Sequence, residues 1–167
     1  MGRFFAVSVI FIVGLFLDGC LGEPPVLPDE TQEGLGTFGC LVDGELVVKH
    51  DVWQWGTRKP YGIRNSAGRF ELIADVEYGH EFRFYVSQPQ VGIQVIDSAI
   101  FRVYEKPYYF AVRNAGQIRF TKFDLSTLIA SGTFEFEANC YDRLTHQLFS
   151  NRKILVNKGV FDLNINR

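Results

Sequence analysis

At residues 37–49 the sequence reads TFGCLVDGELVVK, and this segment is the clearest indication of the fold class. Period-two alternation of apolar and polar side chains, typical of strands with one buried face, begins here. Asp43-Gly44 lies between the two halves, and both residue types tolerate the positive φ that a two-residue turn between antiparallel strands requires. The stretch therefore predicts a β-hairpin formed by residues 37–42 and 45–49.

The same alternation recurs to the C-terminus, and no segment keeps a helical period for three turns. Further strands are predicted at residues 69–76, 81–86, 91–96, 99–105, 108–113, 117–123, 127–139, 152–156 and 160–165. Asn114-Ala115-Gly116 and Asn157-Lys158-Gly159 are turn signals that predict two more hairpins. Gly132 is expected to bend the long strand at a bulge.

About ten strands joined mostly by tight turns predict an all-β domain. An antiparallel β-sandwich and a flattened barrel are both compatible with this pattern.

The N-terminus has the features of an export signal. Residues 1–3 contain one arginine, and residues 4–17 are almost entirely apolar. This run matches the apolar region of a signal peptide and is shorter than the ~20 residues that a membrane-spanning helix needs. We therefore expect residues 1–19 to be a signal peptide.

Leu17-Asp18-Gly19-Cys20 resembles the lipobox of bacterial lipoproteins, although Asp18 stands where a small or apolar residue is usual. The resemblance implies that Cys20 carries a lipid anchor. Residues 20–35 contain three prolines and several acids, which predict an extended, flexible tether that does not pack. Residues 36–167 then form a single β-domain.

Composition limits the partners. A net charge of −2, with Arg113, Arg119 and Lys122 too sparse to form a basic face, argues against nucleic acid. The 16 Phe and 7 Tyr can supply a sizeable core. Cys40 and Cys140 form a disulfide in an oxidising compartment or remain buried free thiols, and the sequence leaves both open.

Four segments carry a family resemblance: residues 36–44, 121–124, 131–136 and 159–162. As a set they resemble small uncharacterised lipoproteins of Bacteroidetes-type bacteria over most of residues 35–167. The resemblance implies an outer-membrane location in the cell envelope and a β fold. It implies no catalytic residue, because the family is a domain of unknown function.

No motif for catalysis, a cofactor or a metal is recognisable. His50, His80 and His146 stand singly, without the spacing that places two metal ligands on one face. Two pairs of carboxylates, Glu71 with Asp75 and Glu135 with Glu137, share a strand face and allow a carbohydrate-active enzyme as an alternative. A solvated sheet face explains these carboxylates without catalysis.

Trp53-Gln54-Trp55 is the one pattern that suggests a ligand site. In an extended segment both indoles lie on one side, and with Tyr61 they could form a platform for sugar rings or close one end of the core. A lipocalin-like carrier of an apolar ligand is a further alternative. The sequence thus predicts a lipid-anchored, non-enzymatic protein with an interaction or accessory-binding role toward a glycan or protein partner.

Overall fold

The computed structural model describes residues 26–49, 59–76, 80–104 and 106–166 of the chain. Among them it contains eleven strands and no helix, which confirms the predicted all-β class. The strands are β1 (Thr37–Val42), β2 (Glu45–Val48), β3 (Tyr61–Arg64), β4 (Phe70–Val76), β5 (His80–Val86), β6 (Gly92–Val95), β7 (Ser98–Val103), β8 (Tyr108–Arg113), β9 (Gln117–Asp124), β10 (Ile129–Asp142) and β11 (Leu148–Asn166).

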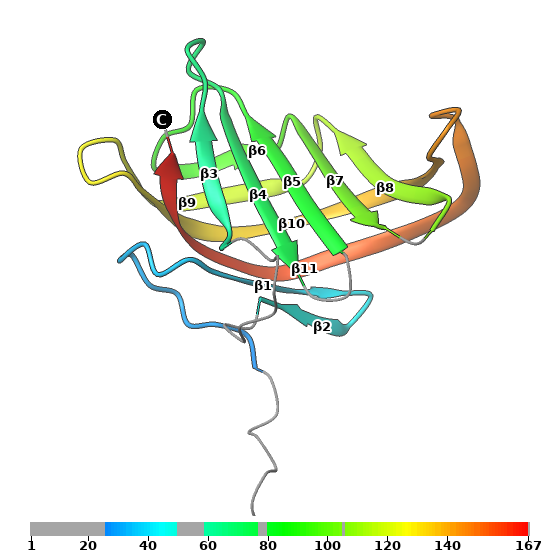
Figure 1. The fold of residues 1–167 in the computed structure, drawn as a ribbon, viewed down its shortest axis with the longest axis horizontal. Helices are drawn as coiled ribbons and strands as arrows, with labels where there is room; N and C mark the ends of the chain where they lie inside the picture. The colour runs from blue at the N-terminus through cyan, green and yellow to red at the C-terminus, as the bar shows by residue number, and fades with distance from the viewer. Residues whose placement is uncertain (1–25, 50–58, 77–79, 105, 167) are drawn as a thin grey trace, which may run out of the picture.

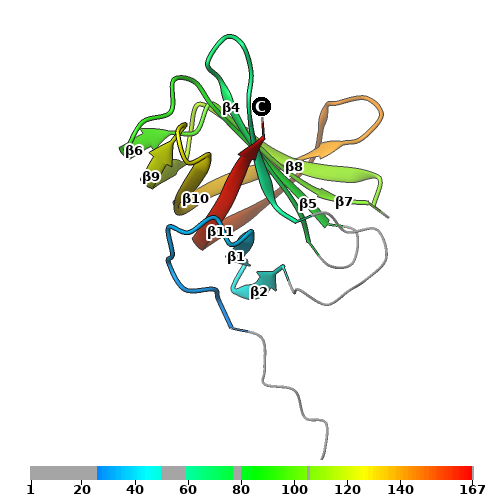
Figure 2. The same cartoon turned by 60° about the vertical axis from the view of Figure 1, so that its left-hand side comes forward.

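The strands form one hydrogen-bonded sheet in the order β2-β1-β11-β3-β4-β5-β7-β8-β10-β9-β6. An additional pairing of β10 with β11 joins distant members of this order, so the strand pairings close on themselves as in a flattened barrel. Figure 1 shows β3, β4, β5, β7 and β8 crossing in front of the long β10 and β11. Figure 2 shows that these two layers meet on one side of the molecule and separate toward the other. All pairings are antiparallel except that of β3 with β11, which is parallel.

The first predicted hairpin is confirmed. Val42 pairs with Glu45, and Asp43 and Gly44 both have positive φ, at 51° and 87°. This is the conformation that a two-residue hairpin turn needs, because its twist matches that of the flanking strands.

Two predicted hairpins are wrong. β8 does not pair with β9: β8 pairs with residues 139–142 of β10, and β9 pairs with residues 129–135 of the same strand. β10 is long enough to take both as neighbours, one after the other. At the C-terminus, Asn157-Lys158-Gly159 is a bulge within the single strand β11, with Lys158 at φ 49°.

Gly132 marks the predicted bulge. The register of β10 against β9 shifts between Ser131 and Gly132. A Cβ at position 132 would lie 1.9 Å from the carbonyl oxygen of Arg119, so only glycine permits this approach of the two backbones.

Phenylalanine fills the space between the two layers. The largest fully buried side chains include Phe38, Phe82 and Phe84. The ring centroids of Phe84 and Phe134 are 4.6 Å apart, and those of Phe38 and Phe134 are 5.3 Å apart. The aromatic composition therefore supplies the core, as predicted.

The predicted flexible tether is wrong for its second half. Residues 26–36, which we call the strap, run beside β11 and β1 at the start of the described chain (Figure 1). Asp162 of β11 lies beneath the strap, is fully buried, and accepts hydrogen bonds from the backbone N–H groups of Glu33, Gly34 and Leu35. A buried carboxylate needs such donors, and they fix the strap to the domain.

Cys40 and Cys140 are both buried free thiols, so the second of the two alternatives that the sequence left open is the one observed. Cys40 lies on β1 next to Gly39, which pairs with Val160 of β11. On the other side of β11, the part of β10 that pairs with this region lies near Phe134. Cys140 lies about 20 Å further along β10, at ~3.3 Å per residue. A disulfide requires Cα atoms within about 7 Å of each other.

Candidate functional site

The outer face of β5, β7, β8 and β10 carries an ordered set of polar and aromatic side chains. Strand pairing aligns Glu81, Arg102, Tyr109 and Tyr141 in one row across the four strands. The alternation of each strand places these side chains on the face opposite the buried phenylalanines. The sequence of each strand thus supplies the face, and the register supplies the row.

Tyr109, Tyr141 and His146 form an aromatic cluster at one end of this face. The rings of Tyr109 and Tyr141 are stacked, with centroids 5.8 Å apart and an interplanar angle of 24°. His146 lies in the turn between β10 and β11, and its Nδ1 is 3.2 Å from the hydroxyl oxygen of Tyr109. The cluster is therefore held by contacts on both sides of Tyr109.

A hollow of about 620 Å³ lies beside this cluster, and we call it the Ala111 hollow. Ala111 pairs with Ile100 on β7 and with Asn139 on β10, and its methyl group leaves space where a longer side chain would stand. The side chains around it are Ser98, Ile100, Tyr109, Arg113, Asn139, Tyr141 and His146. No described residue that lines the hollow is a carboxylate.

Two arginines near the hollow have different surroundings. Nη1 of Arg102 donates a 3.0 Å hydrogen bond to Glu81, which is almost fully buried and also accepts from Arg83 and Tyr104. Burial by itself would raise the pKa of Glu81, but the hydrogen bonds and charges of these neighbours lower it below its ordinary value. Glu81 is thus an anion that is paired with both Arg83 and Arg102.

Arg113, in contrast, is exposed, and its guanidinium has no ion pair or hydrogen bond with another described residue. Burial raises the pKa of Tyr109, and the charges of Arg102 and Arg113 act in the opposite direction. The Tyr109 hydroxyl therefore stays protonated at neutral pH, and Arg113 is close enough for its charge to act on it.

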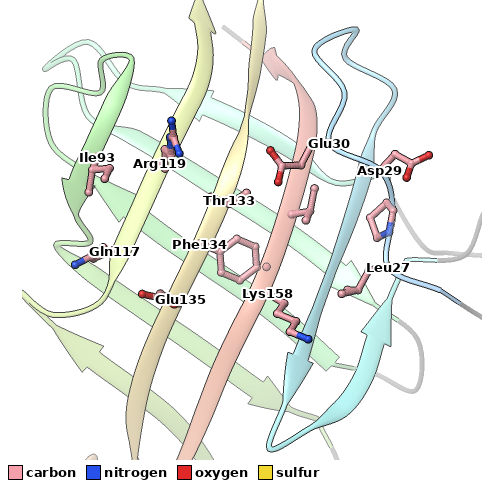
Figure 3. Close-up of a pocket in the computed structure, with 13 residues that line it drawn as sticks. Leu27, Asp29, Glu30, Ile93, Gln117, Arg119, Thr133, Phe134, Glu135 and Lys158 are labelled. Carbon is pink, nitrogen blue, oxygen red and sulfur yellow. The ribbon is translucent and has the colours of Figure 1, made fainter.

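A second groove, of about 640 Å³, lies between the strap and β6, β9, β10 and β11, and we call it the strap groove (Figure 3). Figure 3 shows Glu30 on the strap and Arg119, Thr133 and Lys158 on the three strands beside it. Cations and carboxylates are mixed along this groove, since Asp29, Glu30 and Glu135 line it together with Arg119 and Lys158. One wall is the strap itself, so the width of the groove depends on how the strap is held.

The predicted site residues are only partly described. Trp53 and Trp55 lie outside the described residues, as does Cys20, so the predicted platform and lipid anchor remain predictions. Tyr61 is half-buried on β3 and lines a separate shallow hollow with Lys59.

The predicted carboxylates lie on two different parts of the sheet. Glu71 is on β4 and is 3.5 Å from Arg83, whereas Glu137 is on β10 and forms an ion pair with Lys153. Among the described residues no group of three His, Cys, Asp or Glu side chains is arranged to hold a metal ion. His80 packs against Phe101, and burial lowers its pKa.

Sequence reasoning did not find Tyr109, Ala111, Arg113, Asn139 and Tyr141 as members of one site. The predicted strand at residues 108–113 already places Tyr109, Ala111 and Arg113 on one face. The missing information was the neighbour of that strand, because Asn139 and Tyr141 come from the strand that pairs with it.

Comparisons of this chain with models of protein families, with curated proteins and with solved structures return no match. In the part of the chain that the structure describes, no helix has the length and apolar character to cross a membrane.

Proposed function

We propose that this chain is a lipid-anchored protein of the bacterial outer membrane whose β-domain binds a glycan and is not an enzyme. The observation that carries the binding role is the Ala111 hollow. It combines a small apolar floor, the stacked pair Tyr109 and Tyr141, and polar groups on the opposite side. A volume of about 620 Å³ lies within the ~300–1,000 Å³ typical of small-ligand sites.

The chemistry of the hollow suits a sugar. A sugar ring has apolar C–H faces that rest on aromatic or aliphatic side chains, and hydroxyl groups that need hydrogen-bond partners. Ala111 and Ile100 offer the apolar surface, and Asn139, Ser98 and Tyr141 offer polar groups at its rim. A few polar groups around an apolar floor are the usual composition of a specific site.

The same geometry argues against glycoside hydrolysis. That reaction ordinarily needs two carboxyl groups on either side of the scissile bond. The described lining of the hollow has none, and two of the predicted candidates, Glu71 and Glu137, are engaged with Arg83 and Lys153 elsewhere on the sheet. A carrier that encloses an apolar ligand is also less well supported, because phenylalanine rings fill the interior.

The anchoring part of the proposal rests on the signal-like residues 1–19 and on Cys20. The strap supports it, because it joins the N-terminal segment firmly to the domain. A lipid on Cys20 would then be linked to the domain through only a short segment before the strap.

Calorimetry of the purified full-length protein against a panel of neutral and acidic oligosaccharides tests the binding role. We expect one-to-one binding of at least one oligosaccharide, and Ala111→Trp, which fills the hollow, should weaken it at least tenfold. Because residue 111 lies on the outer face, the variant should fold with stability within about 1 kcal/mol of the wild type.

Thr133→Trp is the matched control, since Thr133 is on the outer face of β10 but lines the strap groove. It should leave binding unchanged. Binding of no oligosaccharide, or equal binding by Ala111→Trp, contradicts the proposed function. Cleaved oligosaccharide after incubation contradicts the non-enzymatic part.

A further inference from the structure

The described lining of the Ala111 hollow contains one guanidinium, that of Arg113, and no carboxylate. The neighbouring Arg102 is paired with the buried Glu81, whereas Arg113 has no hydrogen-bond or ion-pair partner among the described residues. An exposed guanidinium beside a concave site is well suited to pair with an anionic group on a ligand, and its planar fork fits a carboxylate through two parallel hydrogen bonds.

The uncharged polar groups of the hollow are also available. The side chains of Ser98, Asn139 and Tyr141 make no hydrogen bond to another described residue, whereas the Tyr109 hydroxyl already contacts His146. Ser98 pairs with Arg113 across β7 and β8, and Asn139 and Tyr141 lie on β10 on the other side. A ligand on Ala111 would therefore meet the cation on one side and the amide and phenol on the other.

We propose that the glycan bound in the Ala111 hollow is acidic, with the carboxylate of a uronic acid paired with Arg113 and the sugar ring resting on Ala111 beside Tyr141. This inference rests on the proposed binding function and names the ligand class for the same site. The row spacing supports it, because Arg113 and Ala111 are two residues apart on one face of β8, about 7 Å along the strand. The long Arg113 side chain can cover this distance and reach a carboxylate at the edge of a ring that rests on Ala111.

The test uses oligosaccharides of galacturonate, glucuronate and mannuronate, each compared with its own methyl ester. Esterification removes the negative charge and keeps the ring and the linkages. We expect at least one acid form to bind the full-length protein at least tenfold more tightly than its ester, by calorimetry at low and physiological salt. Arg113→Gln should remove this preference by weakening the acid form and leaving the ester unchanged.

Arg119→Gln is the matched control. Arg119 is also an exposed arginine on the outer face of a strand, but it lines the strap groove (Figure 3). Both variants change the net charge equally, so a general electrostatic effect would weaken binding in both. A loss of preference confined to Arg113→Gln supports the inference.

The other outcomes are distinct. Equal binding of acid and ester forms, with loss in Ala111→Trp, overturns the acidic ligand and leaves the proposed function standing. An equal effect of the two arginine variants also overturns it. Binding of neither form by the wild type overturns the acidic ligand, and failure across the neutral panel as well overturns the proposed function.

Discussion

The hydroxyl of Thr31 donates a 2.6 Å hydrogen bond to Oδ2 of Asp162, which lies 131 positions later in the chain. Ser131 of β10 donates a second 2.6 Å hydrogen bond, to Oδ1 of the same carboxylate. Asp162 therefore joins the strap, the last strand and its neighbour at one buried point. The N-terminal segment that leads to the proposed anchor thus begins at a fixed place on the domain.

Asp162→Asn should release the strap. The amide cannot accept all the hydrogen bonds that the carboxylate accepts, and its own N–H groups would face backbone donors. We expect the free energy of unfolding to fall by about 2–3 kcal/mol. Hydrogen exchange should accelerate at residues 31–36, as measured by mass spectrometry.

Asp75→Asn is the control for this change. Asp75 is on the outer face of β4, and its side chain makes no hydrogen bond to the described residues of the strap, so its substitution should leave exchange at residues 31–36 unchanged. Equal protection of the strap in Asp162→Asn and in the wild type would contradict the role of Asp162.

The strap should also loosen in acid. Burial by itself would raise the pKa of Asp162, but hydrogen bonds from Ser131, Thr31, Gly34 and Leu35 lower it below its ordinary value. A carboxyl whose pKa is lowered by folding stabilises the protein fully above the unfolded pKa of about 3.9, and this contribution is lost as the pH falls through the native pKa.

The stability difference between the wild type and Asp162→Asn should therefore be constant from pH 7 to about pH 5 and shrink below about pH 4. Denaturant unfolding of both proteins at each pH measures it. A difference that grows as the pH falls would contradict the assigned direction.

Gly132→Ala should separate β9 from β10. The added Cβ would lie 1.9 Å from the carbonyl oxygen of Arg119, a backbone atom that cannot turn away as a side chain does. We expect a loss of at least about 3 kcal/mol of stability, or no folded protein. Thr133→Ala, at the next position, should cost less than about 1 kcal/mol. Similar melting temperatures for the two variants would contradict the close approach.

A thiol reagent should detect both core cysteines as free thiols. Burial raises the pKa of Cys40 to about 12, so this thiol should react slowly in the native protein. In a Cys20→Ala variant that is denatured without reductant, a thiol reagent should detect Cys40 and Cys140. Detection of neither would restore the disulfide that the sequence left open.

Cys20→Ala should abolish fatty-acid labelling and release the protein from the membrane fraction. The reason is that a thioether-linked lipid, and not the apolar segment at residues 4–17, would hold the mature protein. Metabolic labelling followed by fractionation measures both effects. Labelling that persists in the variant would contradict acylation at Cys20.

Local patterns in the sequence were enough to predict most of the strands. The hairpin at Asp43-Gly44 was predictable because its turn depends on two adjacent residues and their φ angles. The bulge at Gly132 was predictable for a similar reason. The all-β class follows from alternation that is visible within each short segment.

Strand neighbours were not predictable in the same way. Asn114-Ala115-Gly116 and Asn157-Lys158-Gly159 both have turn-forming sequences, yet one links strands that pair with different ends of β10 and the other is a bulge within β11. A turn-forming sequence sets local backbone angles. Which strands then pair depends on how the whole sheet closes.

The strand period, the many aromatic residues of the core and the signal-like N-terminus can all be recognised in the sequence. That Tyr109 lies opposite Tyr141, that Ala111 lies between Ile100 and Asn139, and that Asp162 holds the strap becomes visible only in the folded protein. The difference is one of range along the chain. Alternation and turn chemistry act between residues a few positions apart, whereas each of these contacts depends on the register between strands distant in the chain.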